Sequence, residues 1–593
     1  MTNPIVRDEL YPKYLKAIEL ACEARDYYKS IGDSYYVAGI SQWLSLIYSY
    51  SRQYDKAASC VKEGFENWKS YTLSQYSMYT SDEKSKLYSD FNWEIDTYSR
   101  NAYQNDSNAI FAQVAYDAQL FGKGLLLSSE IGLRELINES NDTKGRASLD
   151  KLQRIKAELT ASATTDEDKQ RLKTEYRAIE RSLMKESQQY GDYMKSMSIT
   201  YADVKAYLKP KDVAIEFATT IPWVPRDSVA YRQYYALVLK RDYTSPKVVK
   251  ICREDALSDP KKLYEAVWKP LADELQGVEN VYFAPTMLLN NRPMESAVCP
   301  NGKLFSKTGL NLYRLSSTRE LVRKHSDKNS KYHVAALYGG LQYDASVSQL
   351  IASDSKERTN GLRSATITGE DLSNDLRKSI VTWKYLAGTK QEVTEIDKIA
   401  TSHGVNSKLY TDSLGTESTF KNLSKRGISL IHLATHGFFV KSNGSYQAED
   451  EQLERSGLVL AGANNLKRGL KLPEGVDDGI LTAAEISRLD FRGLDLVVLS
   501  ACETGLGDLS SEGVYGLQRG FKKAGAGSII MSLWPVSDHA TQILMTTFYR
   551  NLFNGKSKHE ALESAKDYVR TYNGGIYVDE KYWSGFILLD GIN

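Results

Sequence analysis

A histidine and a cysteine stand at corresponding places in two segments of the chain. The apolar run ISLIHLAT leads directly into His436 and Gly437, and the run LDLVVLSA leads directly into Cys502. A thiolate can attack an acyl carbon, while an imidazole can accept the thiol proton and later protonate a leaving amine. The two residues are therefore candidates for a catalytic dyad, with Cys502 as the nucleophile and His436 as the general base and acid.

Acyl transfer also requires hydrogen-bond donors aimed at the oxyanion of the tetrahedral intermediate. The backbone N–H groups of Gly437 and Cys502 are the candidates, and a glycine would let a substrate approach closely. Taken alone, Cys502 is more readily interpreted as a small buried apolar residue at a strand end. His432, on the strand itself, is interpreted as a hydrogen-bonded core histidine.

The dyad can form only if the two strands are neighbours in one sheet. From residue 332 onward, helices alternate with buried-type strands at 333–337, 428–434, 494–499 and 528–533. This alternation predicts a mainly parallel sheet covered on both faces, whose ligands collect beyond the carboxyl ends of the strands. Residues 342–375 and 441–478, rich in Ser, Asn and Gly, are expected to be loop-like insertions.

Upstream segments predict three further units. Residues 1–140 form consecutive amphipathic helices, and 141–200 carry apolar stripes on either side of the polar stretch TASATTDED, which indicates an antiparallel helical hairpin. Residues 201–330 combine β-rich runs at 212–217, 234–239, 247–252 and 280–283 with a helical stretch at 260–275. The large and small positions of a tetratricopeptide helix pair are matched by Leu44, Ser45, Tyr48, Tyr54, Ala57, Val61 and Gly64.

Composition excludes several classes of protein. The 593 residues contain 76 Lys and Arg against 75 Asp and Glu, so the net charge of +1 provides no bulk attraction to nucleic acid or to an anionic membrane. The 5 cysteines include no CxxC pair, which argues against a disulfide framework and a thiolate metal site. No metal or cofactor is expected. Without a signal peptide or an apolar run of about 18 residues, the chain is predicted to be cytoplasmic.

The strings HLATHGFF, DGILTAAEI and LDLVVLSACETGLGDLSSEGVYGLQRGFKKAGAGSIIMSLWPVSD resemble the CHAT domain, the caspase-like fold associated with tetratricopeptide repeats and related to separase. The resemblance implies an α plus α/β fold and a cysteine endopeptidase whose dyad is His436 and Cys502. It places the catalytic domain at residues 331–593. It also implies an inactive caspase-like half at 201–330, where no His-Gly or SxC motif occurs.

Substrate recognition has two acidic candidates. In separase-like relatives an acidic residue near this point receives an arginine side chain, and the matching string LWPVSDHA offers Asp538. A carboxylate there would favour Arg or Lys by charge pairing. The alternative is that Asp538 is the N-cap of the helix that follows it. Asp478, next to Asp477 at the end of the long insertion, is a further candidate.

The expected function is therefore cleavage of a specific protein partner, with the helical region binding a regulatory protein. The resemblance implies a role in bacterial defence or cell death, with a gasdermin or a CRISPR-associated factor as the substrate. The 441–478 insertion is expected to keep the enzyme latent until a partner docks. The alternatives are a non-catalytic scaffold that uses the caspase-like fold only for partner binding, and a thiol acyltransferase.

Overall fold

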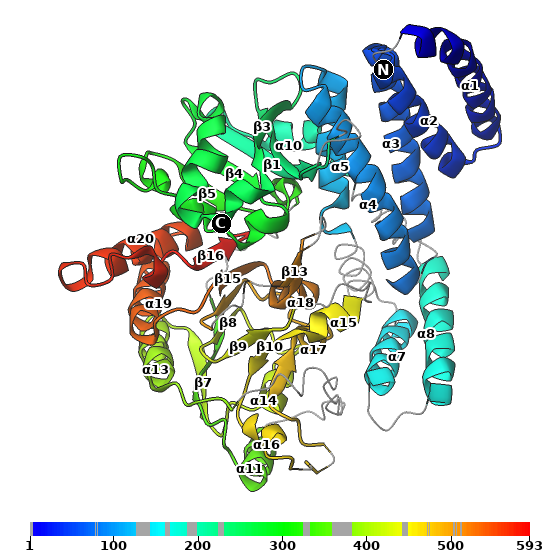
Figure 1. Cartoon of the computed structure of the whole chain (residues 1–593). Helices are drawn as coiled ribbons and strands as arrows, with labels where there is room; N and C mark the ends of the chain where they lie inside the picture. The colour runs from blue at the N-terminus through cyan, green and yellow to red at the C-terminus, as the bar shows by residue number, and fades with distance from the viewer. Residues whose placement is uncertain are drawn as a thin grey trace.

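The chain folds into a helical region followed by one large sheet covered by helices (Figure 1). The computed structural model describes residues 4–592 except 77–78, 80, 126–142, 161–165, 187–197, 223–229, 324–331, 359–381, 442–448, 471, 474, 502–504, 506 and 510–512. Among the described helices, none combines the length and the apolarity that crossing a bilayer requires.

The N-terminal region is an array of antiparallel helices, as the sequence predicts. It contains α1 (Pro4–Ser30), α2 (Ser34–Tyr50), α3 (Tyr54–Tyr76), α4 (Ser81–Gln104) and α5 (Ala109–Gly122). The predicted small positions lie between α2 and α3, where Ala57 is fully buried and a Cβ on Gly64 would come within 3.4 Å of the Ala38 carbonyl oxygen. The hairpin follows as α7 (Thr143–Thr160) packed on α8 (Asp166–Glu186), with Leu152 and Leu172 buried.

Eleven strands of the described chain form a single sheet in the order β3-β2-β1-β4-β5-β16-β15-β12-β8-β6-β7. Its pairs are parallel except β3–β2, β2–β1 and β16–β15, which confirms the predicted mainly parallel sheet. The strands are β1 (Asp212–Thr220), β2 (Gln233–Lys240), β3 (Lys247–Arg253), β4 (Asn280–Ala284), β5 (Asn311–Arg314), β6 (Val334–Leu341), β7 (Asn406–Asp412), β8 (Leu430–Leu433), β12 (Leu496–Leu499), β15 (Ser528–Ser532) and β16 (Phe586–Leu589).

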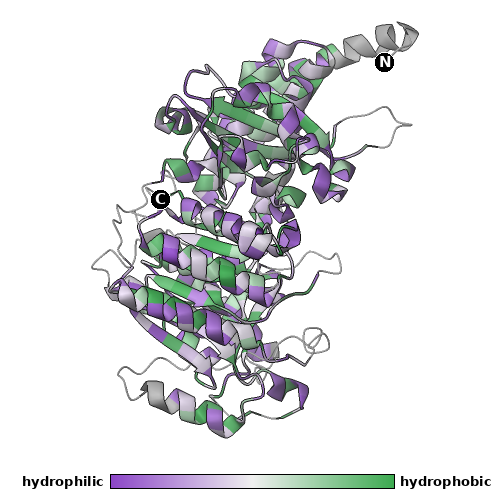
Figure 2. Cartoon of the chain, turned by 90° about the vertical axis from the view of Figure 1, so that its left-hand side faces the viewer, coloured by the Kyte–Doolittle hydropathy of each residue, from purple (hydrophilic) through white to green (hydrophobic). Residues whose placement is uncertain are grey.

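Both faces of the sheet are buried because alternate side chains enter different cores. In β2, Tyr235 and Leu237 pack with the helical array, whereas Tyr234 and Ala236 pack with Trp268 on the opposite face. The array therefore shares one hydrophobic core with the first strands of the sheet. Figure 2 shows green, apolar segments along the strands and helices of mixed polarity beside them.

Helices also cover both faces of the second half of the sheet. One face carries α13 (Ala387–Ser402), α19 (Asp538–Phe553) and α20 (Lys558–Thr571), and the other carries α14 (Glu417–Lys421), α17 (Ala483–Ser487) and α18 (Leu517–Ala524). A Cβ on Gly520 of α18 would lie 2.6 Å from the Ala483 carbonyl oxygen, so this glycine lets α18 pack closely against α17.

Two local predictions are wrong in part. Residues 260–275 form short 3₁₀ and π turns instead of one regular helix, in a stretch that has prolines at 260 and 270. The described parts of the expected insertions carry regular elements: α11 (Val347–Arg358) in the first, and α15 (Glu449–Glu454), β10 (Ser456–Val459) and α16 (Asn464–Lys467) in the second. The short apolar run SGLVL builds β10 within an otherwise polar stretch, and β10 pairs with β9 (Gly437–Phe439) and β11 (Ile480–Thr482).

Candidate active site

The strands that precede His436 and Cys502 are neighbours in the sheet. β8 and β12 are parallel, Leu433 lies opposite Leu499, and the Ser500 N–H donates to the Leu433 carbonyl at 2.9 Å. His436 follows Leu433 by three residues, and Cys502 follows Leu499 by the same number. The condition that the two strands be neighbours in one sheet is therefore met. Cys502 itself lies outside the described residues, so the dyad stays a prediction.

The chain on either side of residues 502–504 is tied to the end of β15. The Ser532 hydroxyl donates to the Ala501 carbonyl at 2.5 Å, and the Gly505 N–H donates to the Ser532 carbonyl at 2.7 Å. A Cβ on Gly505 would lie 3.0 Å from that carbonyl oxygen, so a side chain at this position would crowd the contact. Ala501 and Gly505, the described residues on either side of 502–504, thus lie at the same edge of the sheet as His436.

His436 is held by a backbone carbonyl and two aromatic rings. Its Nε2 lies 2.8 Å from the carbonyl oxygen of Lys384. The rings of Tyr343 and Trp383 each stand 5.1 Å from the imidazole, centroid to centroid. The Tyr343 hydroxyl in turn lies 2.9 Å from Thr435 Oγ1, next to His436 in the chain. The imidazole therefore has a fixed plane.

The Lys384 contact determines which nitrogen can act as a base. A carbonyl oxygen only accepts hydrogen bonds, so the proton of a neutral His436 must be on Nε2, which leaves Nδ1 as the acceptor. Burial lowers the pKa of the imidazole, against the opposing effects of the Lys384 hydrogen bond and the Asp538 charge. At neutral pH the ring is consequently uncharged and able to accept a proton through Nδ1.

The backbone N–H of Gly437 faces away from its neighbouring strand. β9 is the edge of the sheet β11-β10-β9, and the Val459 N–H of β10 donates to the His436 carbonyl at 2.9 Å. Hydrogen-bonded and non-hydrogen-bonded positions alternate along antiparallel strands. The Gly437 N–H, one residue on, therefore points to the open edge, where an oxyanion donor would be needed.

Asp538 lies at the first residue of α19, and its side chain is exposed. The alternative that it caps the helix is wrong, because Ser537 occupies the N-cap position. Its charge acts on both Tyr343 and His436, in each case raising the pKa. The structure thus brings the Asp538 carboxylate within electrostatic range of the imidazole.

Asp478 has a different set of neighbours. Its Oδ1 accepts the Ile480 N–H at 2.8 Å, and its charge is felt in a buried group around Lys421. The Lys421 ammonium contacts Glu417 at 2.6 Å, Glu485 at 2.9 Å and Asp477 at 3.0 Å. These contacts fasten the end of the insertion to α14 and α17. They give Asp478 a structural role and connect it to none of the groups around His436.

His432 is a core residue, as predicted. It is fully buried, with Nδ1 at 3.1 Å from the Tyr549 hydroxyl and Nε2 at 2.9 Å from Glu392 Oε1. Both ring nitrogens are thereby engaged on the α13 and α19 side of the sheet. His432 faces away from Tyr343 and Trp383, the rings that hold His436.

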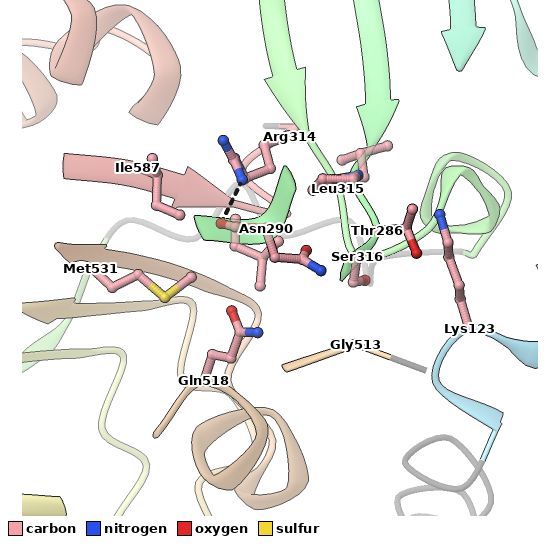
Figure 3. A pocket seen from close by; sticks show the side chains of 12 residues that line it. Lys123, Thr286, Asn290, Arg314, Leu315, Ser316, Gly513, Gln518, Met531 and Ile587 are labelled. Atoms are coloured by element: carbon pink, nitrogen blue, oxygen red, sulfur yellow. Dashed lines mark hydrogen bonds between the residues drawn. The ribbon is translucent and has the colours of Figure 1, made fainter. Parts of the chain in front are cut away.

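A small cavity of about 50 Å³, partly open to solvent, lies where the two halves of the sheet meet (Figure 3). The two cationic groups that the described part of the chain places at its wall, Lys123 and Arg314, are already paired. The Lys123 ammonium contacts Glu216 at 2.6 Å, and Arg314 contacts Glu295 through two nitrogens at 2.7 and 2.8 Å. Their charges are neutralised within the fold, so neither of these two side chains is free to bind an anionic ligand.

If His436 is a catalytic base, its protonation state determines the pH dependence of activity. A base with a lowered pKa stays neutral in more acidic solution, so the acid limb of kcat/KM is expected to have its midpoint below the value of about 6.5 for a free histidine. Removing the Asp538 charge by Asp538→Asn should move that midpoint lower still, because this carboxylate favours the protonated ring. A midpoint at or above 6.5, unmoved by Asp538→Asn, would contradict this assignment.

Comparison with known proteins places this site in a family. The CHAT domain matches residues 259–591, which is more than half of the chain. Tetratricopeptide repeat protein 28 is 33% identical over 111 residues in mouse and 33% identical over 110 residues in human, which is 18% of this chain but 4% of either relative. The aligned stretch is thus a small part of those proteins.

Two solved structures are also similar. The Arg-specific cysteine proteinase gingipain R aligns with a TM-score of 0.32 and 11% identity, covering 57% of this chain and 68% of that one. Separase, in the separase–securin complex of Saccharomyces cerevisiae, aligns with a TM-score of 0.34 and 8% identity, covering 96% of this chain and 48% of that one. On the match over residues 259–591, which includes His436, the chain belongs to the CHAT domain family.

Proposed function

We propose that this protein is a cysteine endopeptidase in which Cys502 and His436 hydrolyse a peptide bond of a protein partner. The observation that carries the proposal is the in-register pairing of β8 with β12, which directs the segments after Leu433 and Leu499 to one edge of the sheet. The caspase-like CHAT family supports the same chemistry.

The reaction would use the neutral imidazole described above. His436 Nδ1 accepts the thiol proton as the Cys502 sulfur attacks the carbonyl carbon, and the C=O electron pair moves to oxygen. The N–H groups of Gly437 and Cys502 stabilise this oxyanion. When the C–N bond breaks, Nδ1–H protonates the leaving amine. Water then attacks the thioester, again losing its proton to Nδ1, and the acid product and the free thiol are released.

The pairing of Nε2–H with the Lys384 carbonyl supports both proton transfers. The imidazolium formed after thiol deprotonation still donates through Nε2–H to the Lys384 carbonyl. The carbonyl dipole therefore stabilises the positive charge, while Nδ1–H faces the substrate. The negative charge of Asp538 also acts on the imidazole. We therefore also propose that peptides with Arg or Lys before the scissile bond are preferred.

The insertion is proposed to restrain the enzyme before a partner docks. Glu449 of α15 contacts Arg519 of α18 at 2.5 Å, and Arg455 forms an ion pair with Asp508 of β13 (Gly507–Leu509). Both contacts join the insertion to the segment that follows the cysteine. Loss of the Glu449 contact in Glu449→Gln is expected to accelerate reaction of Cys502 with a substrate-like probe.

The partner is proposed to be a protein that contacts the helical array. Along α1 and α2, the side chains of Tyr27, Tyr36 and Trp43 are 61%, 49% and 46% exposed. Aromatic side chains with one polar atom are enriched in protein interfaces. Repeat proteins and a separase–securin complex among the similar proteins are consistent with this. The gasdermin and bacterial-defence expectations have no supporting feature among the described residues.

Labelling with peptidyl electrophiles tests the proposal. Three of the other thiols are poor competitors, because burial raises the pKa of Cys60 and of Cys252 to about 11, and raises the pKa of Cys299 as well. A pool of probes ending in Arg, Lys, Asp or Leu is expected to modify Cys502, fastest with the basic probes, and to require His436. Absence of Cys502 labelling in both the wild type and Glu449→Gln would favour the scaffold alternative.

A further inference from the structure

The segment that supplies two of the contacts to His436 is held by a side chain. Trp383 provides one aromatic wall and Lys384 provides the carbonyl acceptor. Neither residue belongs to a strand. Their backbone is paired with the carboxamide of Asn464, because the Trp383 N–H donates to Asn464 Oδ1 at 2.9 Å and Asn464 Nδ2 donates to the Trp383 carbonyl at 3.0 Å. The two bonds form a clamp that replaces a strand partner.

Asn464 is itself fixed. It is 1% exposed, its backbone N–H donates to the Tyr343 carbonyl at 3.0 Å, and its Nδ2 also donates to Asp344 Oδ1 at 3.1 Å. Tyr343 is the second aromatic wall of His436. One buried residue of α16 thus connects both walls of the imidazole, although it lies 28 residues after His436 in the sequence.

We propose that Asn464 is a positioning residue that holds the Lys384 carbonyl and the Trp383 ring against His436, an inference that rests on the proposed function. Asparagine suits the position because its amide offers a donor and an acceptor together. Aspartate has the same shape, but it would turn an oxygen toward the Trp383 carbonyl and the Asp344 carboxylate. Alanine would leave the Trp383 backbone groups without their partners.

The effect of losing the clamp should appear in turnover. A displacement of about 1 Å in a catalytic group reduces the rate on the order of 100-fold. Asn464→Asp is therefore expected to lower kcat about 100-fold, with a much smaller change in KM, because the contact acts on the imidazole.

Asn465 provides a matched control. It is also 1% exposed, and its Nδ2 donates to the Ala345 carbonyl at 2.9 Å. Asn465→Asp introduces the same chemical change one residue away and breaks one buried hydrogen bond, yet it leaves the Trp383 backbone paired. Its kcat should stay within a few-fold of the wild type.

A proton NMR measurement separates positioning from general stability. When the Nε2–H of His436 donates to a carbonyl, its proton exchanges slowly with water and should give a downfield imidazole resonance. The resonance is assigned by its absence from the spectrum of His436→Gln. We expect this resonance in the wild type and in Asn465→Asp, and its loss in folded Asn464→Asp. If Asn464→Asp does not unfold cooperatively, the measurement uses Asn464→Ala instead. Alanine lacks the repulsion between a carboxylate at position 464 and Asp344.

The proposal would be overturned if the Asn464 variant retained the Nε2–H resonance. It would also be overturned if the Asn465 variant lost this resonance to the same extent as the Asn464 variant. Neither outcome depends on protease activity, because the resonance reports only the His436 contact. Failure of the proposed function would appear separately, as unchanged peptide cleavage in Cys502→Ala.

Discussion

Replacing either Cys502 or His436 by alanine is expected to lower the rate constant for peptide hydrolysis by about 10⁴-fold. Without the thiol no acyl-enzyme forms, and without the imidazole neither the thiol nor the amine can exchange its proton. Because the two groups act as a unit, the double replacement should lower the rate little further than either single one. The measurement is kcat/KM for one peptide selected from a cleaved pool.

Matched variants control for effects on the fold. Cys299→Ala removes a buried thiol from the segment between β4 and β5, and His403→Ala removes an exposed histidine after α13. Both should retain activity. Multiplicative losses in the Cys502 and His436 double variant would mean that the two residues act independently, which is inconsistent with a dyad.

Replacing Lys123 by methionine is expected to destabilise the protein by about 3–5 kcal/mol. Lys123 follows α5, and its ammonium donates to Glu216 at 2.6 Å and to the Phe217 and Ala284 carbonyls at 3.0 and 3.2 Å. The other oxygen of Glu216 accepts the Thr318 N–H at 2.6 Å. Lysine and glutamate are both buried, so methionine would leave an uncompensated carboxylate between the helical array and the sheet.

An exposed ion pair gives the comparison. Lys211 contacts Glu279 at the surface, and Lys211→Met should change the free energy of unfolding by less than about 1 kcal/mol. Adding Glu216→Gln to Lys123→Met should restore part of the stability, because the neutral amide removes the buried charge. The free energies are measured by denaturant unfolding. A cost for Lys123→Met no greater than that for Lys211→Met would contradict the account.

The arrangement of the central strands could be predicted from the sequence because its physical signal is local. Runs such as 428–434 and 494–499 are apolar throughout, which indicates strands buried on both faces. The end of each run carries His436 or Cys502, and parallel strands place their carboxyl ends at one edge. Strand β16 was not among the predicted strands; it lies between β5 and β15, antiparallel to β15 and parallel to β5, and joins the two halves of the sheet.

The surroundings of His436 could not be predicted in the same way. The hydrogen-bond acceptor for His436 Nε2 is the backbone carbonyl of Lys384. Every residue type has such a carbonyl, so the sequence does not indicate which one is used. Asn464 lies in a polar stretch whose composition indicates a loop. Only the fold shows that its amide pairs with Trp383. The alternative that Asp538 is an N-cap differs from the structure by one residue, because sequence alone does not distinguish an N-cap from the first helical residue.

The most direct test of the central claim is a comparison of new peptide termini after a proteome-derived peptide pool is incubated with the wild type and with Cys502→Ala. We predict a set of cleavages, enriched in Arg or Lys before the broken bond, that is present with the wild type and absent with the variant. Identical termini in the two samples would contradict the assignment of Cys502 as the nucleophile.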